Sequence, residues 1–404
     1  MQNQPTFKKE FVALMASLMS IVALSIDALL PALPEIGNHF GIDSLSDRQL
    51  LITMIFLGIG TGQLIFGPLS DSFGRKTMVY LGFCVFIISS IVCVTTKNYD
   101  LMIIARIFQG IGLSSPRTMA IAMTRDSYKG DFMAKVISII VMFFILVPII
   151  APTYGQFLLN QFGWKAIFNA NLIIGTVIII WFWLRQPETL VAAKRIKFRP
   201  QIFITGTKEF FRYKDAVAFT LMSGFITGSF MVYLSTSQQI FQVQYDLGEW
   251  FPYIFASTAF SVGFATFMNS QLVIRYGSFN IAYWATIGYA VISLLYVVFY
   301  FSGNNPHIGI LIAFLLIQFF FVGFLFGNLR SLAMEPLGHI AGIGAAINGF
   351  ISTVLAVPIA NYIGSFVTSS VLPLFIGFSV FGVLSFVTFL LLKQHRKQFR
   401  FYNA

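Results

Sequence analysis

Twelve long apolar segments limit what this chain can fold into. Each is about twenty residues long, the length a helix needs to cross ~30 Å of hydrocarbon at ~1.5 Å per residue. Hydrophobic residues make up 57% of the 404 residues and charged residues only 10%, against about 25% charged residues in an average soluble domain. The sequence therefore predicts an all-α integral membrane protein with twelve transmembrane helices. These helices are expected at residues 11–33, 47–68, 77–96, 100–122, 134–155, 165–185, 215–236, 250–272, 280–301, 308–329, 342–366 and 372–392.

Basic residues predict the orientation of these helices. With a cytoplasmic N-terminus, 21 of the 26 Lys and Arg residues fall on the cytoplasmic side, and only Arg48, Lys97 and Lys165 fall on the other. The remaining two, Arg106 and Arg117, lie inside the fourth expected helix. Positive charge is enriched in cytoplasmic loops, so we expect both termini in the cytoplasm. The first apolar segment lacks a small-residue cleavage site, so we expect it to be retained rather than removed as a signal peptide.

One long polar connection, residues 186–214, separates two sets of six expected helices. The sequence thus predicts an N-terminal six-helix bundle at 1–185, a cytoplasmic linker at 186–214, and a C-terminal bundle with a short cytoplasmic tail at 215–404. Short matches between the halves indicate a weak internal repeat, although short apolar matches also arise by chance. Parallel six-helix repeats with a binding site near the middle of the membrane are a transporter architecture.

Several functional classes find no support in the sequence. The two cysteines, Cys84 and Cys93, are nine residues apart, which places them on opposite faces of one helix. No pair among the four histidines has metal-ligand spacing, and no nucleophile motif or phosphate-binding loop is present. The net charge of +11 is scattered between apolar segments rather than clustered on one face. We therefore expect no enzyme activity, no cofactor, no metal and no nucleic-acid partner.

A single acid, Asp27, falls clearly within an expected membrane span. A charge at the centre of a membrane helix costs ~2.5–3.5 kcal/mol even on insertion scales, so such residues usually face an interior and act there. Asp27 lies roughly 7.5 Å outside the middle of its helix, and Arg106 lies at the same depth in the fourth helix. Arg117 lies on the inner side instead. Depth therefore predicts Arg106 as the neighbour of Asp27.

A buried carboxylate near a cation suits a proton carrier. Burial disfavours the charged form of the carboxyl group, and an opposite charge favours it. If a cavity opens to each side in turn, both effects change, and Asp27 can take a proton on one side and release it on the other. Two alternatives remain open: a fixed ion pair between the first and fourth helices, and an Asp27 close enough to the outer surface to stay hydrated.

The stretch "GPLSDSFGRKT", residues 67–77, connects the second and third expected helices. It resembles the signature loop of the major facilitator superfamily. The resemblance implies the major facilitator fold, two six-helix pseudo-repeats, and a cytoplasmic gate in which the Asp and basic residues clasp the eleventh helix. The alternative is a basic turn that only sets topology. The motif residues here are Gly67, Asp71, Gly74, Arg75 and Lys76.

Two further motifs support this resemblance. "RIFQGIG", 106–112, is similar to the family's fourth-helix motif and makes Arg106 the motif arginine. "PIIAPTYG", 148–155, resembles the fifth-helix motif of antiporters through Pro148, Pro152 and Gly155, but lacks the usual glycine before the proline. Prolines at these positions also bend a helix whatever its function.

The stretch "SIDALLPALP", 25–34, resembles the first-helix signature of the Bcr/CflA drug-resistance subfamily. This likeness covers nearly the whole chain, about 10–392. It departs from the subfamily at Leu29, where Tyr is common, and at Arg117, which lies one turn before the usual second basic residue. Both differences concern positions that could line the cavity, so the cargo could differ from that of the subfamily.

The resemblance implies a proton-coupled multidrug or small-molecule exporter that works by alternating access. An exporter of an endogenous metabolite such as a siderophore or peptide is the alternative; a proton-driven importer, or a membrane receptor, is less favoured. We expect small-molecule cargo, protons and the lipid bilayer as partners, a monomer, and an inner-membrane location. The candidate proton-coupling residues are Asp27 and Arg106. The candidate cavity residues are Ser25, Leu29, Gln109, Arg117, Met231, Tyr233, Gln318 and Asn328.

Overall fold

The computed structural model describes residues 9–195 and 201–402, and every regular element in these ranges is helical. Residues 196–200, part of the predicted linker, lie outside the described residues, as do 1–8 and 403–404. The chain divides into two compact units, 1–200 and 201–404. The domain boundaries predicted at 186 and 214 stay a prediction.

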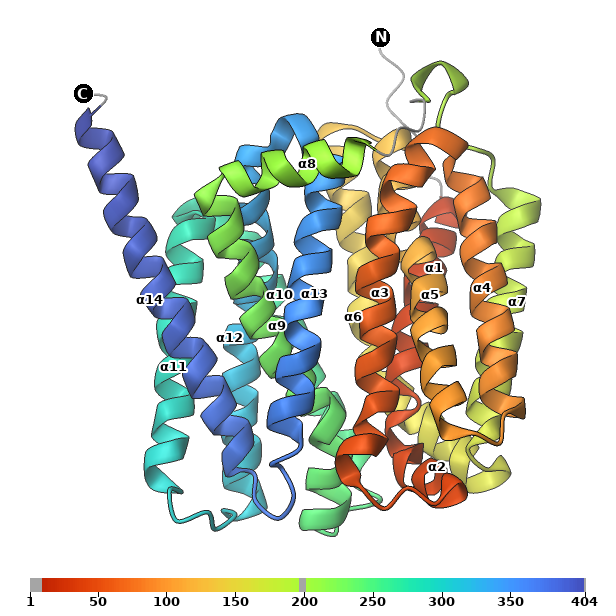
Figure 1. Cartoon of the computed structure of the whole chain (residues 1–404), viewed down its shortest axis with the longest axis vertical. Coiled ribbons are helices and arrows are strands. Elements are labelled where there is room, and N and C mark those ends of the chain that lie inside the picture. The colour runs from red at the N-terminus through yellow and green to blue at the C-terminus, as the bar shows by residue number, and fades with distance from the viewer. Residues whose placement is uncertain (1–8, 196–200, 403–404) are drawn as a thin grey trace. The chain divides into compact units, whose positions relative to one another are not determined.

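Unit 1 is a bundle of long helices (Figure 1). Small residues permit close contact between some of their backbones. The helix α5 packs against α3 and α4, and α1 packs against α6. A Cβ atom at Gly58 or at Gly110 would overlap the backbone of the facing helix, the device by which membrane helices approach closely. The elements are α1 (Lys9–Asp27), a 3-10 turn (Leu30–Ala32), α2 (Leu33–Phe40), α3 (Leu45–Phe73), α4 (Arg75–Thr95), α5 (Tyr99–Ser127), α6 (Gly130–Phe162), α7 (Lys165–Arg185) and a 3-10 turn (Ala192–Lys194).

Unit 2 is a second bundle, in which α9 packs against α12, α13 and α14. Its α9 continues at its far end as a π-helix, Gln239–Gln244. The elements are α8 (Gln201–Arg212), α9 (Lys214–Gln238), α10 (Phe251–Tyr276), α11 (Ser278–Phe299), α12 (Ile308–Met334), a 3-10 turn (Glu335–Ile340), α13 (Ala341–Gly364) and α14 (Leu372–Tyr402).

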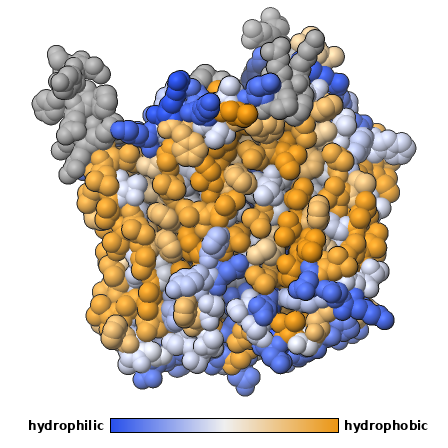
Figure 2. Space-filling view, in the orientation of Figure 1, coloured by the Kyte–Doolittle hydropathy of each residue, from blue (hydrophilic) through white to orange (hydrophobic). Residues whose placement is uncertain are grey.

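Eleven helical segments of the described residues are long and apolar enough to cross a membrane. The one predicted span outside this set is that at 100–122, which corresponds to α5. This helix is 29 residues long but carries buried polar side chains, including Arg106 and Gln109. On the face shown in Figure 2, hydrophobic residues cover the middle of the helices and hydrophilic residues gather toward their ends. The predicted all-helical, multi-pass membrane fold is therefore confirmed.

The structure differs from the sequence-based expectations in three places. The first span, expected as one helix to residue 33, breaks after Asp27, because Pro31 and Pro34 follow closely. Gly67 and Asp71 lie within α3 rather than in a loop, and only Gly74, with φ of +97°, separates α3 from α4. The predicted linker contains α8, which packs against α13. The apolar residues of α8 recur at helical spacing, a pattern that is visible in the sequence.

Candidate functional site

Arg106 is fully buried in unit 1 and joins four helices from its position on α5. Its Nε donates to the carbonyl oxygen of Leu51 on α3 at 2.8 Å, and its Nη1 donates to the carbonyl oxygen of Ser25 on α1 at 3.3 Å. Nη1 also donates to Oε1 of Gln109 at 2.5 Å. The guanidinium carbon lies 5.8 Å from the ring centroid of Phe168 on α7. Carbonyl oxygens and an aromatic ring thus hold this cation in place.

Asp27 lies at the last residue of α1, where the helix breaks, and is only 5% exposed. Among the described residues, its carboxylate has no hydrogen-bond partner and forms no ion pair. The guanidinium of Arg106 bonds instead to the carbonyl of Ser25, two residues earlier. The structure therefore places both residues at the α1–α5 contact. It does not join Asp27 and Arg106 in a fixed ion pair, which was one of the two alternatives to a proton carrier.

The antiporter-like motif lies on α6 and contacts the same break in α1. Pro148 and Pro152 are inside α6, which continues without interruption to Phe162. Gly155 follows on the same helix, and a Cβ atom there would overlap the carbonyl oxygen of Ala28. Because Ala28 directly follows Asp27, the backbone of α6 rests on the segment that carries the buried acid.

The residues of the 67–77 stretch form a charged network at one end of unit 1. Nη1 of Arg75 lies 2.6 Å from the carboxylate of Asp71 and donates to Oγ of Ser70 at 2.5 Å. Its Nε lies 3.0 Å from Oδ2 of Asp126, at the end of α5. Nζ of Lys76 donates to a backbone carbonyl oxygen near the end of α7, at 3.2 Å. Arg75 thus links α3, α4 and α5.

Glu188, which the sequence did not single out, completes this network. Its carboxylate accepts from the backbone N–H groups of Arg75 and Lys76, at 3.1 Å each, and so caps the N-terminus of α4. It also accepts from the N–H groups of Thr189 and Leu190. The acceptor comes from a loop more than a hundred residues further along the chain, so no local pattern around α4 predicts it.

The other candidate residues of unit 1 lie near Arg106 or along α5. Gln109 donates to Oγ of Ser90 on α4 at 2.7 Å and so extends the Arg106 contacts to that helix. Ser25 is buried and donates to the carbonyl oxygen of Ile21, and Leu29 is buried next to the 3-10 turn. Arg117 is half-buried, with its guanidinium carbon 5.8 Å from the ring centroid of Phe144.

The four candidates of unit 2 are buried within that unit. Tyr233 on α9 shares a 2.8 Å hydrogen bond with Thr258 on α10. Gln318 on α12 donates to the carbonyl oxygen of Tyr289 on α11 at 3.3 Å, and its Oε1 has no partner among the described residues. Asn328 donates to Oδ1 of Asn269 at 2.6 Å. Met231 completes the set. These amide and hydroxyl contacts join neighbouring helices of one unit.

Tyr233 belongs to an aromatic cluster of unit 2 that also includes Phe255 and Phe319. The Tyr233 ring centroid lies 4.5 Å from that of Phe319, and its ring stacks on that of Phe255 at 6.0 Å. Aromatic side chains combine large apolar area with fixed geometry. This region of unit 2 is therefore a buried, mainly aromatic cluster that contains the hydrogen-bonded hydroxyl groups of Tyr233 and Thr258.

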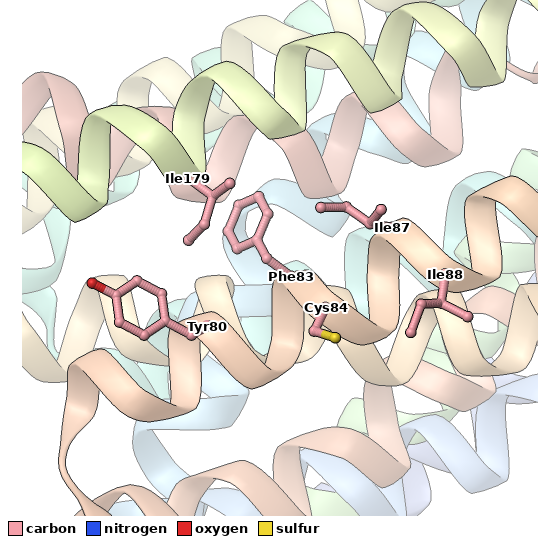
Figure 3. A pocket seen from close by; sticks show the side chains of 6 residues that line it. All are labelled: Tyr80, Phe83, Cys84, Ile87, Ile88 and Ile179. Atoms are coloured by element: carbon pink, nitrogen blue, oxygen red, sulfur yellow. The ribbon is translucent and has the colours of Figure 1, made fainter.

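A separate apolar groove of about 310 Å³ lies between α4 and α7 (Figure 3). Tyr80 contributes a polar atom to it, and the Oη of this residue has no hydrogen-bond partner among the described residues. The remaining lining side chains are Phe83, Cys84, Ile87, Ile88 and Ile179. Cys84 is exposed and Cys93 is buried, so the two cysteines do lie on different faces of α4. This groove has none of the convergent polar groups expected of a cargo site.

Two curated relatives resemble the chain over most of its length. An uncharacterized MFS-type transporter, YdgK, of Bacillus subtilis is 28% identical over 92% of this chain and 93% of its own. A bicyclomycin resistance protein homolog of Haemophilus influenzae is 27% identical over 69% of each chain. The resemblance drawn from the "SIDALLPALP" and "GPLSDSFGRKT" stretches agrees with these relatives.

A solved structure and a family model support the same assignment. The crystal structure of a D-xylose-proton symporter matches with a TM-score of 0.72 at 14% identity, covering 94% of this chain and 97% of the symporter, which shows a common fold. The sequence model of the Major Facilitator Superfamily matches residues 15–360. This chain belongs to the Major Facilitator Superfamily.

Proposed function

We propose that the protein is a proton-coupled exporter of small molecules, most of all drugs, which works by alternating access in the bacterial inner membrane. One observation carries the coupling proposal: Asp27 is a buried carboxyl group with no hydrogen-bonding or ionic partner among the described residues. The cargo class is supported by the Bcr/CflA-like signature at 25–34 and by the relative named for bicyclomycin resistance. The family supports a transporter rather than an enzyme.

The isolation of Asp27 gives it the chemistry of a proton carrier. A buried carboxylate without a partner is costly, whereas the protonated form carries no charge and is tolerated. Arg106 does not neutralise it in this arrangement: Nε and Nη1 donate to carbonyl oxygens, Nη2 has no hydrogen-bond partner among the described residues, and no ion pair joins the guanidinium to Asp27. When the site opens to the outer side, Asp27 takes up a proton and stays neutral as the site closes. When the site opens to the cytoplasm, water favours the charged form and the proton is released there. Arg106 then fixes the ends of α1, α3 and α5 around the acid.

The remaining motif residues are assigned supporting roles. Asp71 and Arg75 would form part of a cytoplasmic gate that opens and closes with each cycle, and Gly155 would let α6 move against the break in α1. In unit 1, cargo contacts are assigned to Ser25, Leu29, Gln109 and Arg117. In unit 2, they are assigned to Met231, Tyr233, Gln318 and Asn328.

The alternative cargo is an endogenous metabolite such as a siderophore or peptide. The specific observation that favours it is the pair of subfamily departures, Leu29 and Arg117. Arg117 is a cation near the aromatic ring of Phe144, and a cation in the cavity would suit an anionic compound. Growth of a deletion strain under iron starvation separates this cargo from the drugs tested by ordinary susceptibility assays.

Transport by inverted vesicles tests the proposal. A pH gradient, acid inside, is imposed, and dyes, antibiotics and siderophores are added while a pH probe reports proton release. We expect one or more compounds to trigger proton leak, and Asp27→Asn to abolish that leak. Asp43→Asn, which removes an exposed acid of the α2–α3 loop, is the matched control and should leak as the unchanged protein does. Compound-driven leak that persists in Asp27→Asn would refute the coupling role.

A further inference from the structure

Unit 2 carries a groove that the transport proposal does not use. It has a volume of about 430 Å³ and lies where the end of α10 meets α11 and α12. This volume is in the range of small-molecule sites, about 300–1,000 Å³. Apolar and aromatic side chains form most of its wall, and Asn280 and the hydroxyl group of Tyr276 are its polar members. Its lining residues are Tyr276, Asn280, Ile281, Trp284, Ala285, Phe321 and Phe324.

The surroundings of the groove are those of a lipid-facing surface. Trp284, one of its walls, is 67% exposed. On α11, Val291 and Val298 follow Trp284 at intervals of seven residues and are 46% and 70% exposed. A seven-residue interval keeps side chains on one face of a helix. Such an apolar stripe suits contact with hydrocarbon, and because Trp284 belongs to it, the groove opens toward the bilayer.

A cation lies at the polar end of the groove. Arg275 is exposed, and its guanidinium carbon is 5.3 Å from the ring centroid of Tyr276. Among the described residues, Arg275 forms no ion pair. Guanidinium groups match the geometry of phosphate oxygens. The turn after Tyr276 belongs to the side predicted to be cytoplasmic, where anionic lipids attract basic residues.

We propose that this groove binds one acyl chain of an anionic phospholipid, whose phosphate group lies at Arg275. The aromatic walls hold the chain, and Asn280 and Tyr276 lie at the level of the headgroup. The groove of Figure 3 is a weaker candidate, because its nearest cation, Lys76, donates to the carbonyl oxygen of Trp183 and belongs to the proposed gate. The lipid site requires no cargo and no proton coupling.

Trp284 supplies the probe for a test on the full chain. The protein is reconstituted in phosphatidylcholine bilayers that contain increasing fractions of phosphatidylglycerol with brominated acyl chains, which quench tryptophan emission on contact. The signal of Trp284 is the difference between the unchanged chain and Trp284→Phe, because four other tryptophans are present. One basic residue near the membrane surface corresponds to about a fivefold preference for an anionic lipid. We therefore expect brominated phosphatidylglycerol to quench Trp284 as if it occupied the groove about five times more readily than brominated phosphatidylcholine does.

Variants of the cation decide whether the preference arises at the groove. Arg275→Gln should reduce the fivefold preference to about one, and Arg275→Lys should keep most of it. Arg125→Gln removes an exposed cation at the end of α5 in unit 1 and should leave the preference unchanged. Raising the ionic strength should weaken the preference in the unchanged chain, a measurement that needs no variant to fold. Equal quenching by both lipids, or an unchanged preference in Arg275→Gln, would overturn the proposal.

Discussion

At the scale of single residues, Arg106 shows how a guanidinium stabilises a membrane bundle without a carboxylate partner. It donates to Leu51, Ser25 and Gln109, and so connects α5 to α3 and α1. Lysine has one compact ammonium group on a flexible stem and cannot reproduce this fork. We therefore expect Arg106→Lys to lose about 2 kcal/mol or more of stability, since each hydrogen bond to a charged group is worth ~1.5–3 kcal/mol.

Thermal unfolding in detergent measures the effect of Arg106→Lys, and transport assays should show a parallel loss. The matched control is Arg125→Lys, because Arg125 is exposed at the end of the same helix. That variant should unfold at the temperature of the unchanged protein. Equal unfolding temperatures for Arg106→Lys and Arg125→Lys would show that the carbonyl contacts contribute little.

Gly155 gives a second prediction at the same scale. A methyl group there would overlap the carbonyl oxygen of Ala28, so Gly155→Ala must separate α6 from the break in α1. Intrinsic helix propensity alone would favour alanine over glycine by about 0.5–1 kcal/mol. We expect lower stability and slower transport despite that gain. Gly248→Ala is the control, because no atom lies within 4 Å of the added Cβ there; a Gly155→Ala variant that is as stable as this control contradicts the close contact.

At the scale of elements, the N-terminus of α4 depends on an acceptor from a distant loop. Glu188 accepts from the N–H groups of Arg75 and Lys76. Loss of a capping acceptor costs ~0.5–2 kcal/mol, and a negative charge at a helix N-terminus contributes ~0.3–1 kcal/mol. We expect Glu188→Ala to reduce the unfolding free energy by about 1–2 kcal/mol. Glu188→Gln, which keeps one acceptor oxygen, should lose about half as much.

An exposed ion pair supplies the comparison for the cap. Glu10 accepts from Nε and Nη2 of Arg185, at 2.6 and 3.0 Å, and both side chains are largely exposed. Such pairs are screened by salt. In denaturation at low and high ionic strength, Glu10→Ala should change stability slightly and only at low salt, whereas Glu188→Ala should destabilise at both. The same salt dependence for both variants would show that Glu188 acts as a surface charge rather than as a cap.

The positions of the helices followed from the sequence because twenty-residue apolar segments have few alternatives in a bilayer. Their ends were harder to predict. Pro31 shortened the first helix, and α3 continued through Asp71 to Phe73, because a helix can extend beyond the hydrocarbon wherever its backbone finds partners. The amphipathic α8 was not predicted, because its 12 residues are too few and too polar to form a membrane span, although its apolar residues recur at helical spacing.

The site could be predicted only in part, for a physical reason. Helix depth placed Asp27 and Arg106 at one level, and the structure brings their helices together. Depth says nothing about side-chain direction, and the guanidinium extends to the carbonyl of Ser25. Likewise, motif spacing identified Asp71 and Arg75, which form an ion pair. The partners Asp126 and Glu188 come from other elements, and only the packing of the unit makes them neighbours.

At the scale of the whole molecule, the strongest remaining expectation is its orientation in the membrane. It depends on the asymmetry of basic residues, 21 of 26 on one side, and Lys and Arg bias loops toward the cytoplasm. Lys97, between α4 and α5, and Arg125, at the opposite end of α5, are both exposed. They are therefore suited to report the two sides of the membrane.

Cysteine labelling measures this orientation. In a chain with Cys84 and Cys93 replaced by alanine, Lys97→Cys should react with a membrane-impermeant maleimide in intact spheroplasts. Arg125→Cys should react only after the membrane is permeabilised. Because the two sites lie at opposite ends of α5, just before its start and near its last residue, they must lie on opposite sides of the membrane if α5 spans it. The polar side chains of α5 keep it out of the set of apolar spans. Labelling of both sites in intact spheroplasts would contradict a spanning α5, and the reverse pattern would place the basic ends of the helices outside.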